Sequence, residues 1–180
     1  MRVELATTFL IASFVAGCSA DNQEDDAQSQ VRRARATLTS MTGSTATGTM
    51  TFTANAASVR LNISIANVPP SSVHGFHIHA GTSCGPDGTA AGDHWNPMNV
   101  AHGEWSEGVH HLGDIGNIDA RLDGTGADEI MTDLWTVGTG SMDDVVGRTA
   151  VLHANADDYV TQPNGNTGAP IACGVIQLME

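Results

Sequence analysis

The sequence predicts an all-β domain, either a sandwich or a closed Greek-key β-barrel of eight short strands. Apolar and polar residues alternate strictly in 59–65, and small or apolar residues share one face of 46–53 while Thr fills the other. The chain contains 20 Gly, which suit the many turns between short strands, and no segment shows a convincing helical period. Further strands are expected at 34–41, 73–80, 112–121, 129–137, 145–153 and 171–178.

The first 18 residues read as an export signal. An apolar run from Leu5 to Val15 is too short to span a bilayer and has the length of a signal-peptide core. The run ends in the letters VAGC, which resemble the bacterial lipobox, a motif whose Cys is lipidated and becomes the new N-terminus. We therefore expect lipid attachment at Cys18. A plain secretory signal cleaved near Ala20 is the alternative, and both readings place the domain outside the cytoplasm.

A polar segment, 19–33, follows the signal and has no apolar period, so it is expected to be a flexible tether before a folded domain at 34–180. The residue after Cys18 is Ser19 rather than Asp, which resembles the signal for the outer membrane in enteric bacteria. We expect a protein anchored on the periplasmic side of a bacterial membrane, at the outer membrane rather than the inner one.

The charge excludes nucleic acid as a partner. The chain has no Lys, and 7 Arg oppose 20 acidic residues, which gives a net charge of −13 with His neutral. Nucleic-acid binding depends on Lys and Arg that neutralise phosphates, so this chain is not expected to bind it. The sequence leaves a homodimer open.

Two long connections, 81–111 and 154–170, contain or flank most of the eight histidines, and long loops in a compact domain are usually functional. On the strand at 73–80, His77 and His79 share the outward face, where two imidazoles can bind one metal. An inert pair on a solvated strand is the alternative. His74 lies on the core side and is expected to be a buried, hydrogen-bonded structural residue.

A second group of donors follows along the chain. Three His and one Asp make a complete tetrahedral donor set for zinc with no open position, as in structural zinc sites: His94, His102, His111 and Asp114. The strand at 145–153 ends in His153, which alternation turns outward, so it is the missing partner for His77 and His79.

Five segments resemble the copper–zinc superoxide dismutase family, in order and throughout residues 73–178: HGFHIH, GDHWNP, HLGDIGNI, VVGRTAVLHANADD and GNTGAPIACGVI. The strands at 34–66 fit the first hairpin of that family less distinctively. The resemblance implies a Greek-key barrel with one copper and one zinc per chain. It also implies superoxide as the substrate, with copper cycling between two oxidation states as one superoxide leaves as dioxygen and the next as hydrogen peroxide.

The resemblance assigns each site residue by position. The copper ligands are His77, His79, His94 and His153, and the zinc ligands are His94, His102, His111 and Asp114, so His94 bridges the two metals. Asp157 matches a carboxylate that joins a copper-ligand His to a zinc-ligand His, the alternative being a solvated loop acid. Cys84 and Cys173 match the disulfide of the family, the alternative being two free thiols. His110 matches no ligand and is expected at the surface.

One position departs from the family pattern. The family usually has an Arg near the copper that holds the anionic substrate, and Pro170 stands there in this chain. From Ala36 to the end, 3 Arg face 15 acidic residues. We therefore expect a field at the copper that helps superoxide little or repels it, which affects the rate rather than the metal site. A copper-binding or copper-buffering lipoprotein with low turnover and a barrel whose metals only stabilise the fold are the alternatives to a dismutase.

Overall fold

The computed structural model describes residues 31–180. The expected signal peptide, the lipidation residue Cys18 and the tether as far as residue 30 lie outside the described residues. Within 31–180, no helix is long and apolar enough to cross a membrane. The strands are β1 (Arg32–Ser40), β2 (Thr47–Ala54), β3 (Val59–Ala66), β4 (Val73–His79), β5 (Asp114–Asp119), β6 (Gly126–Thr132), β7 (Thr149–His153), β8 (Pro170–Val175) and β9 (Gln177–Leu178).

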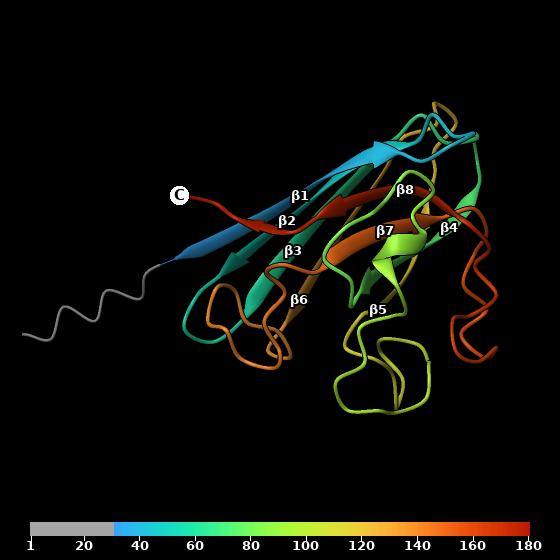
Figure 1. Cartoon of the computed structure of the whole chain (residues 1–180). Coiled ribbons are helices and arrows are strands. Elements are labelled where there is room, and N and C mark those ends of the chain that lie inside the picture. Colours follow the sequence, from blue (N-terminus) through green and yellow to red (C-terminus); the bar gives the residue numbers. More distant parts are fainter. Residues whose placement is uncertain (1–30) are drawn as a thin grey trace, which may run out of the picture.

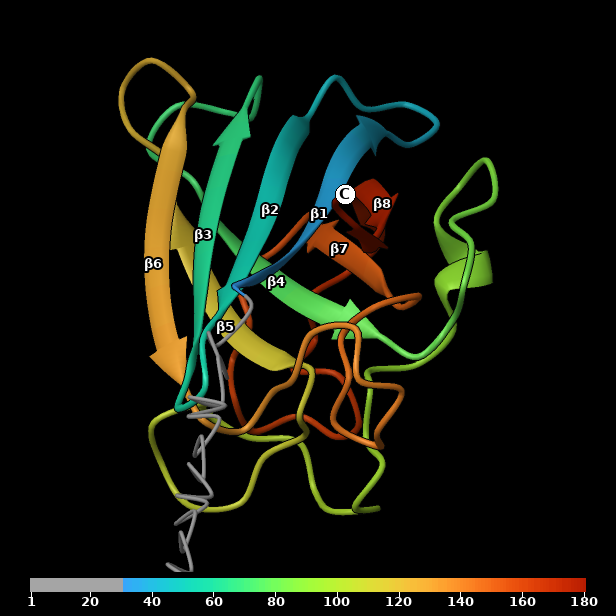
Figure 2. The same ribbon diagram turned by 90° about the vertical axis from the view of Figure 1, so that its left-hand side faces the viewer.

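The strands form an antiparallel, nearly closed barrel, as the sequence predicted. The hydrogen-bonded order is β5-β4-β7-β8-β1-β2-β3-β6, and the short β9 pairs with β1. One wall carries β1, β2, β3 and β6, and the other carries β5, β4, β7 and β8 (Figures 1 and 2). The connections from β3 to β4 and from β6 to β7 pass from one wall to the other, which is the Greek-key feature.

The period-two pattern places the core between the two walls. On β3 the buried residues alternate with exposed ones, and β1 shows the same alternation. The largest fully buried side chains include Phe52, Phe76, Leu61 and Trp95. Apolar side chains thus fill the interior of the barrel, so a polar site must lie on its outer surface.

Several strand limits differ from the expected ones. β1 begins at Arg32, because Arg32 and Arg33 pair with Ala54 and Thr53 of β2; the expected tether therefore ends earlier. The expected last strand is divided at Ile176, whose backbone N–H donates to Arg148 instead of continuing the ladder to β1.

The segment 133–148 is a loop rather than the ends of two strands. The carboxylate of Asp144 accepts backbone N–H groups from Gly138, Gly140 and Val146, at 2.7–3.0 Å. These local bonds give the backbone an alternative to a sheet ladder. β6 therefore ends at Thr132 and β7 begins at Thr149, later than the expected start at 145.

The outer face of β4 is covered by the two long connections. Six of its seven residues are buried, whereas a strand with one solvated face would alternate. The first connection leaves β4, contains a short 3-10 helix at Thr89–Ala91 and returns to β5; the second runs from β7 to β8. The histidines therefore lie between the barrel wall and its covering loops.

Candidate metal centre

Four histidines gather on the outer face of β4 and β7. Their ligand nitrogen atoms lie within 4.8 Å of one another, and the four side chains are buried: His77, His79, His94 and His153. Strand alternation and pairing explain the cluster, because β4 lies beside β7 and carries two of these rings on one face. His94 joins them from the loop, where it forms an isolated bridge with His79. We call these four residues the His77 cluster.

A second group of four donors adjoins the first and shares His94 with it. Its ligand atoms also lie within 4.8 Å of one another, and all its members are buried: His94, His102, His111 and Asp114. Oδ1 of Asp114 lies 2.7 Å from Nδ1 of His94 and 3.1 Å from Nδ1 of His111, and Oδ2 lies 3.0 Å from Nδ1 of His102. We call these residues the Asp114 cluster.

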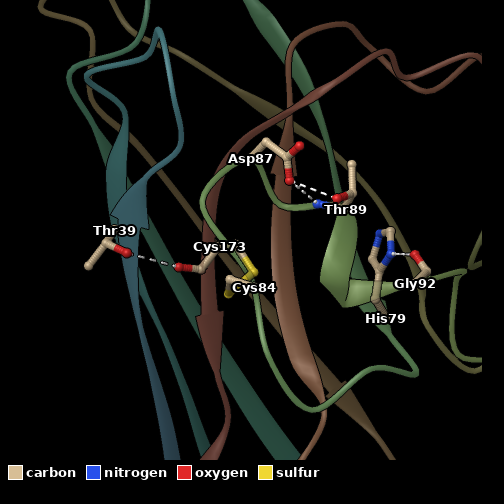
Figure 3. The surroundings of a disulfide bond; sticks show 7 residues. All are labelled: Thr39, His79, Cys84, Asp87, Thr89, Gly92 and Cys173. Atoms are coloured by element: carbon tan, nitrogen blue, oxygen red, sulfur yellow. Dashed lines mark hydrogen bonds between the residues drawn. A yellow bond between two sulfur atoms is a disulfide. The ribbon is translucent and has the colours of Figure 1, made fainter.

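Hydrogen bonds to the outer ring nitrogens fix how each histidine faces its cluster. Nδ1 of His79 donates to the carbonyl oxygen of Gly92 at 2.7 Å, and Nδ1 of His153 donates to Gly168 at 3.2 Å (Figure 3 shows the first). Nε2 of His111 donates to Val100 at 3.1 Å. Each ring therefore turns its other nitrogen, with a lone pair, toward the cluster.

These lone pairs face one another at short range. Nε2 of His79 lies 3.2 Å from Nε2 of His153, although both rings donate their Nδ1 protons elsewhere. Nδ1 of His77 and Nε2 of His94 are buried without a hydrogen-bond partner. Buried polar atoms of native proteins normally have partners. A cation between them would satisfy these atoms, and imidazole and carboxylate donors suit both copper and zinc.

Asp157 connects the two clusters. Its Oδ2 lies 2.7 Å from Nε2 of His77, and its Oδ1 lies 2.9 Å from Nε2 of His102. Its backbone is held by Asn117, whose amide donates to the Asp157 carbonyl at 2.9 Å and accepts its N–H at 2.7 Å. The carboxylate is fully buried, so it is not a solvated loop acid.

The sequence analysis named neither Asn117 nor a second amide with a similar role, Gln162. Gln162 accepts the backbone N–H of His102 at 2.8 Å and donates to its carbonyl at 2.9 Å. This pair joins the second long connection to the first at a member of the Asp114 cluster. Gln162 lies outside the matched motifs, whereas Asn117 lies within HLGDIGNI, so only Asn117 had a sequence signal.

Burial sets the charge of the histidines in the His77 cluster. It lowers the pKa of His77, His79 and His153 to about 3, because a charged imidazole there loses its hydration and meets other rings. These rings are therefore neutral at physiological pH, which is the state that binds metals.

The Asp114 cluster favours positive charge instead. Burial opposes the protonation of His102, but hydrogen bonds to Asp114 and Asp157 outweigh it and raise the pKa of His102 to about 9. The same bonds overcome burial at both carboxyls and hold the pKa of each well below its usual range. The two ionised carboxylates of Asp114 and Asp157 lie on either side of the His102 ring, and this negative charge favours a cation at the site.

The disulfide expected from the resemblance is present, between Cys84 and Cys173. It joins the first long connection to β8, next to the segment whose Gly92 holds His79 (Figure 3). His74 is buried; its Nδ1 donates to the His153 carbonyl at 2.8 Å, and its Nε2 lies 2.7 Å from the Ser72 hydroxyl. His110 is half-buried rather than fully at the surface, because its ring packs on Trp105 with centroids 4.9 Å apart.

A pocket leads to both clusters. It is lined by His79, His94, His111 and His153 together with parts of the two long connections and of the loop before β7. Pro170 is not among its lining residues; it pairs with His153 and packs against Gly88. Arg148 does line the pocket. The loop 133–148 thus brings an Arg to the pocket, at a place other than position 170.

Comparison with known proteins agrees with this geometry. The sequence model of the family described as copper/zinc superoxide dismutase (SODC) matches residues 46–176. The chain is 35% identical over 127 residues to an extracellular superoxide dismutase [Cu-Zn] of Haemonchus contortus, covering 67% of this chain and 68% of that one. It is 38% identical over 121 residues to superoxide dismutase-like protein YojM of Bacillus subtilis, covering 64% and 61%.

Solved structures show the same fold. The crystal structure of the clock protein EA4 aligns with a TM-score of 0.72 and 29% identity, over 83% of this chain and 96% of that one. Together with the family match, which spans most of the barrel and both clusters, this shows that the chain belongs to the copper/zinc superoxide dismutase family of oxidoreductases.

Proposed function

We propose that this protein is a superoxide dismutase that holds copper in the His77 cluster and zinc in the Asp114 cluster. The observation that carries the proposal is the set of buried lone pairs that converge without partners in two adjoining clusters that share one ring. Bound copper supplies one-electron redox chemistry, which the side chains of the chain lack. The closed set of three His and one Asp supports a structural zinc.

The chain itself positions the rings and handles a proton. Nδ1 of His94 lies in the Asp114 cluster, 2.7 Å from Oδ1 of Asp114. Its Nε2 lies on the side of the His77 cluster without a partner, so Nε2 is the atom that can take up and give back a proton. Conversion of two superoxide ions to dioxygen and hydrogen peroxide consumes two protons, and the ring lies at the wall of the pocket through which a small anion enters. The neutral His79 and His153 stay fixed by their carbonyl partners meanwhile.

The test is the decay of superoxide, followed spectroscopically after a pulse, with the full chain loaded with copper and zinc. We expect about one copper and one zinc per chain, and a rate that scales with bound copper. Decay no faster than in buffer, at full copper occupancy, would overturn the dismutase assignment. Rapid exchange of that copper with a chelator would then favour a copper-buffering protein, and slow exchange would favour metals that only stabilise the barrel.

We propose that the domain acts outside the cytoplasm, attached through lipid at Cys18 to the periplasmic side of a bacterial membrane. The VAGC motif supports lipidation, and a relative described as extracellular supports export. Expressed in a bacterium, the full chain should fractionate with membranes and carry the mass of a lipid, and Cys18→Ser should lose both. An unmodified Cys18 in the exported protein would exclude the anchor.

A further inference from the structure

We propose that Arg148 is the residue that draws the anionic substrate into the pocket, by holding a fixed positive charge over Trp95 beside the His77 cluster. The identity of the anion as superoxide rests on the proposed function. The attraction itself does not, because it applies to any small anion that enters the pocket.

The backbone places Arg148 next to the candidate copper ligands. It immediately precedes β7, whose first residue Thr149 is the register partner of His79. Its guanidinium carbon lies 3.9 Å above the ring of Trp95, the residue that follows His94. A guanidinium over the face of an indole is a favourable cation–π arrangement. The arginine is thus held against the segment that carries the shared ring.

Two further contacts fix the side chain. Nε donates to the carbonyl oxygen of Asp144 at 2.9 Å, and Nη2 lies 3.5 Å from that of Met142. Both partners are carbonyl groups rather than carboxylates. The carboxylate of Asp144 accepts backbone N–H groups of Gly138 and Gly140. The contacts orient the guanidinium, and no carboxylate of residues 31–180 lies within ion-pair distance of it, although the negative charge of Asp144 acts on it from farther away.

Arg148 is the sole permanent cation among the residues that line this pocket, and Asp93 is the sole carboxylate. The other basic side chains of the lining, those of His79, His94, His111 and His153, are candidate metal ligands and carry no permanent positive charge. Arg148 itself is half-buried; this lowers its pKa, but from so high a value that it stays charged at neutral pH.

The position of this charge decides its effect. The chain is acidic as a whole, so distant carboxylates repel an anion, but salt screens such distant charges. A half-buried cation on the wall of a pocket is screened less and raises the local concentration of anions where the reaction takes place. A single Arg so placed can therefore act against a net charge of the opposite sign.

Binding of azide tests the proposal without reference to turnover. Azide is titrated into the copper- and zinc-loaded full chain and followed by the visible absorption of Cu(II), and the superoxide rate is measured on the same samples at about 0.01 M salt. We expect Arg148→Gln to weaken azide binding and to slow the reaction by about two- to tenfold, the range for one charge near a pocket. Arg148→Lys, which keeps the charge, should retain most of the azide affinity and most of the superoxide rate.

The matched control is Arg35→Gln, which removes the same charge from the exposed outer face of β1 and should change neither quantity measurably. Arg148→Met keeps an apolar stem over Trp95 and replaces the glutamine variant if that variant does not fold. Adding Asn164→Lys, on the exposed rim of the pocket, to Arg148→Gln should restore azide binding in part, which a purely structural role of Arg148 does not predict.

The outcomes separate this inference from the proposed function. Unchanged azide affinity and rate in Arg148→Gln and Arg148→Met, at full copper occupancy, would overturn the role of Arg148 even if the protein is a dismutase. Loss of azide binding in those variants, in a protein without dismutase activity, would support the role of Arg148 and overturn the dismutase.

Discussion

Nδ1 of His94 lies 2.7 Å from Oδ1 of Asp114. The opposite nitrogen of the same ring, Nε2, is buried without a partner, and the ring centroid lies 4.1 Å from that of His77. One imidazole therefore presents an atom to each cluster. This shared ring makes the two candidate metal sites interdependent, although their other ligands come from separate elements.

His94→Ala should lower both copper and zinc below about one per chain, because one substitution removes a donor from each cluster. Elemental analysis of the full chain after loading and dialysis measures this. His110→Ala is the control, since it removes a nearby histidine that belongs to neither cluster. Normal occupancy of both metals in His94→Ala would show that the ring is not shared.

Asp157→Asn should weaken metal binding by about 10- to 100-fold, the usual cost of losing a carboxylate that orients ligating histidines. An amide cannot accept from His77 and His102 through two equivalent oxygens, so one ring loses its orientation. Competition with a chelator gives the affinities for both metals. Asp158→Asn, at the exposed neighbour that accepts only local bonds, should leave them unchanged; equal effects at the two positions would contradict the connecting role.

The sequence predicted the barrel because a strand with one buried face must alternate, as 59–65 does. It predicted strand limits less well where side chains bond the local backbone. The carboxylate of Asp144 accepts three backbone N–H groups, and the segment around it forms a loop where a strand was expected. The neighbouring residues in the sequence do not indicate which groups this carboxylate binds.

The two clusters were predictable because every donor except His102 lies in one of the five segments that resemble the family. The supporting residues were harder to find. Gln162 and His102 are 60 residues apart and meet only after both loops have folded. Arg148 lies in a matched motif, but its place at the pocket depends on stacking over Trp95, a contact across 53 residues that no local pattern encodes.

The metal-free chain should be most stable near pH 6.5. The folded pKa of His77, His79 and His153 is about 3 against an ordinary 6.5, so the unfolded chain binds more protons between these values and stability falls as the pH falls below 6.5. His102 has the opposite effect, because its pKa is about 9 in the folded chain against an ordinary 6.5. Its contribution to the stability of the fold is therefore complete below pH 6.5 and is lost as the pH rises toward 9.

Calorimetry of the metal-free chain tests this. Each low-pKa histidine contributes about 1.4 kcal/mol per pH unit in that window, which corresponds to about 3–5 °C in Tm for a domain of this size. We expect a Tm that falls from pH 6.5 toward pH 4.5 and also toward pH 9. A Tm that stays constant between pH 6.5 and 4.5 would mean that the histidines are not buried as described.

Removal of the disulfide by Cys84→Ser with Cys173→Ser should destabilise the domain by about 4–5 kcal/mol in the chain-entropy model for a loop of this length, since 89 residues separate the cysteines. Thermal unfolding should show a fall in Tm of about 10–20 °C. Cys18→Ser, which leaves this disulfide intact, is the control. Copper affinity should fall as well, because the released segment carries the Gly92 carbonyl that orients His79.

At the pocket, the attraction of one near cation opposes the repulsion of many distant carboxylates. Arg148 is fixed at the pocket, whereas the 15 acidic residues after Ala36 are distributed over the domain. The Debye length falls from about 30 Å at 0.01 M salt to about 8 Å at 0.15 M, so added salt removes the distant repulsion before the near attraction. The rate constant with superoxide should therefore stay flat or rise with ionic strength.

Pro170→Arg should raise that rate at low salt. Pro170 is the register partner of His153, so a long cationic side chain there begins beside a candidate copper ligand and adds a second charge to that of Arg148. Steering can change association rates by about 10- to 1,000-fold, so a gain should be measurable. Pro170→Gln, a polar residue without charge, controls for the loss of proline. A steep fall of the unmodified rate with salt would show that attraction already dominates, and the acidic surface would then not limit entry to the pocket.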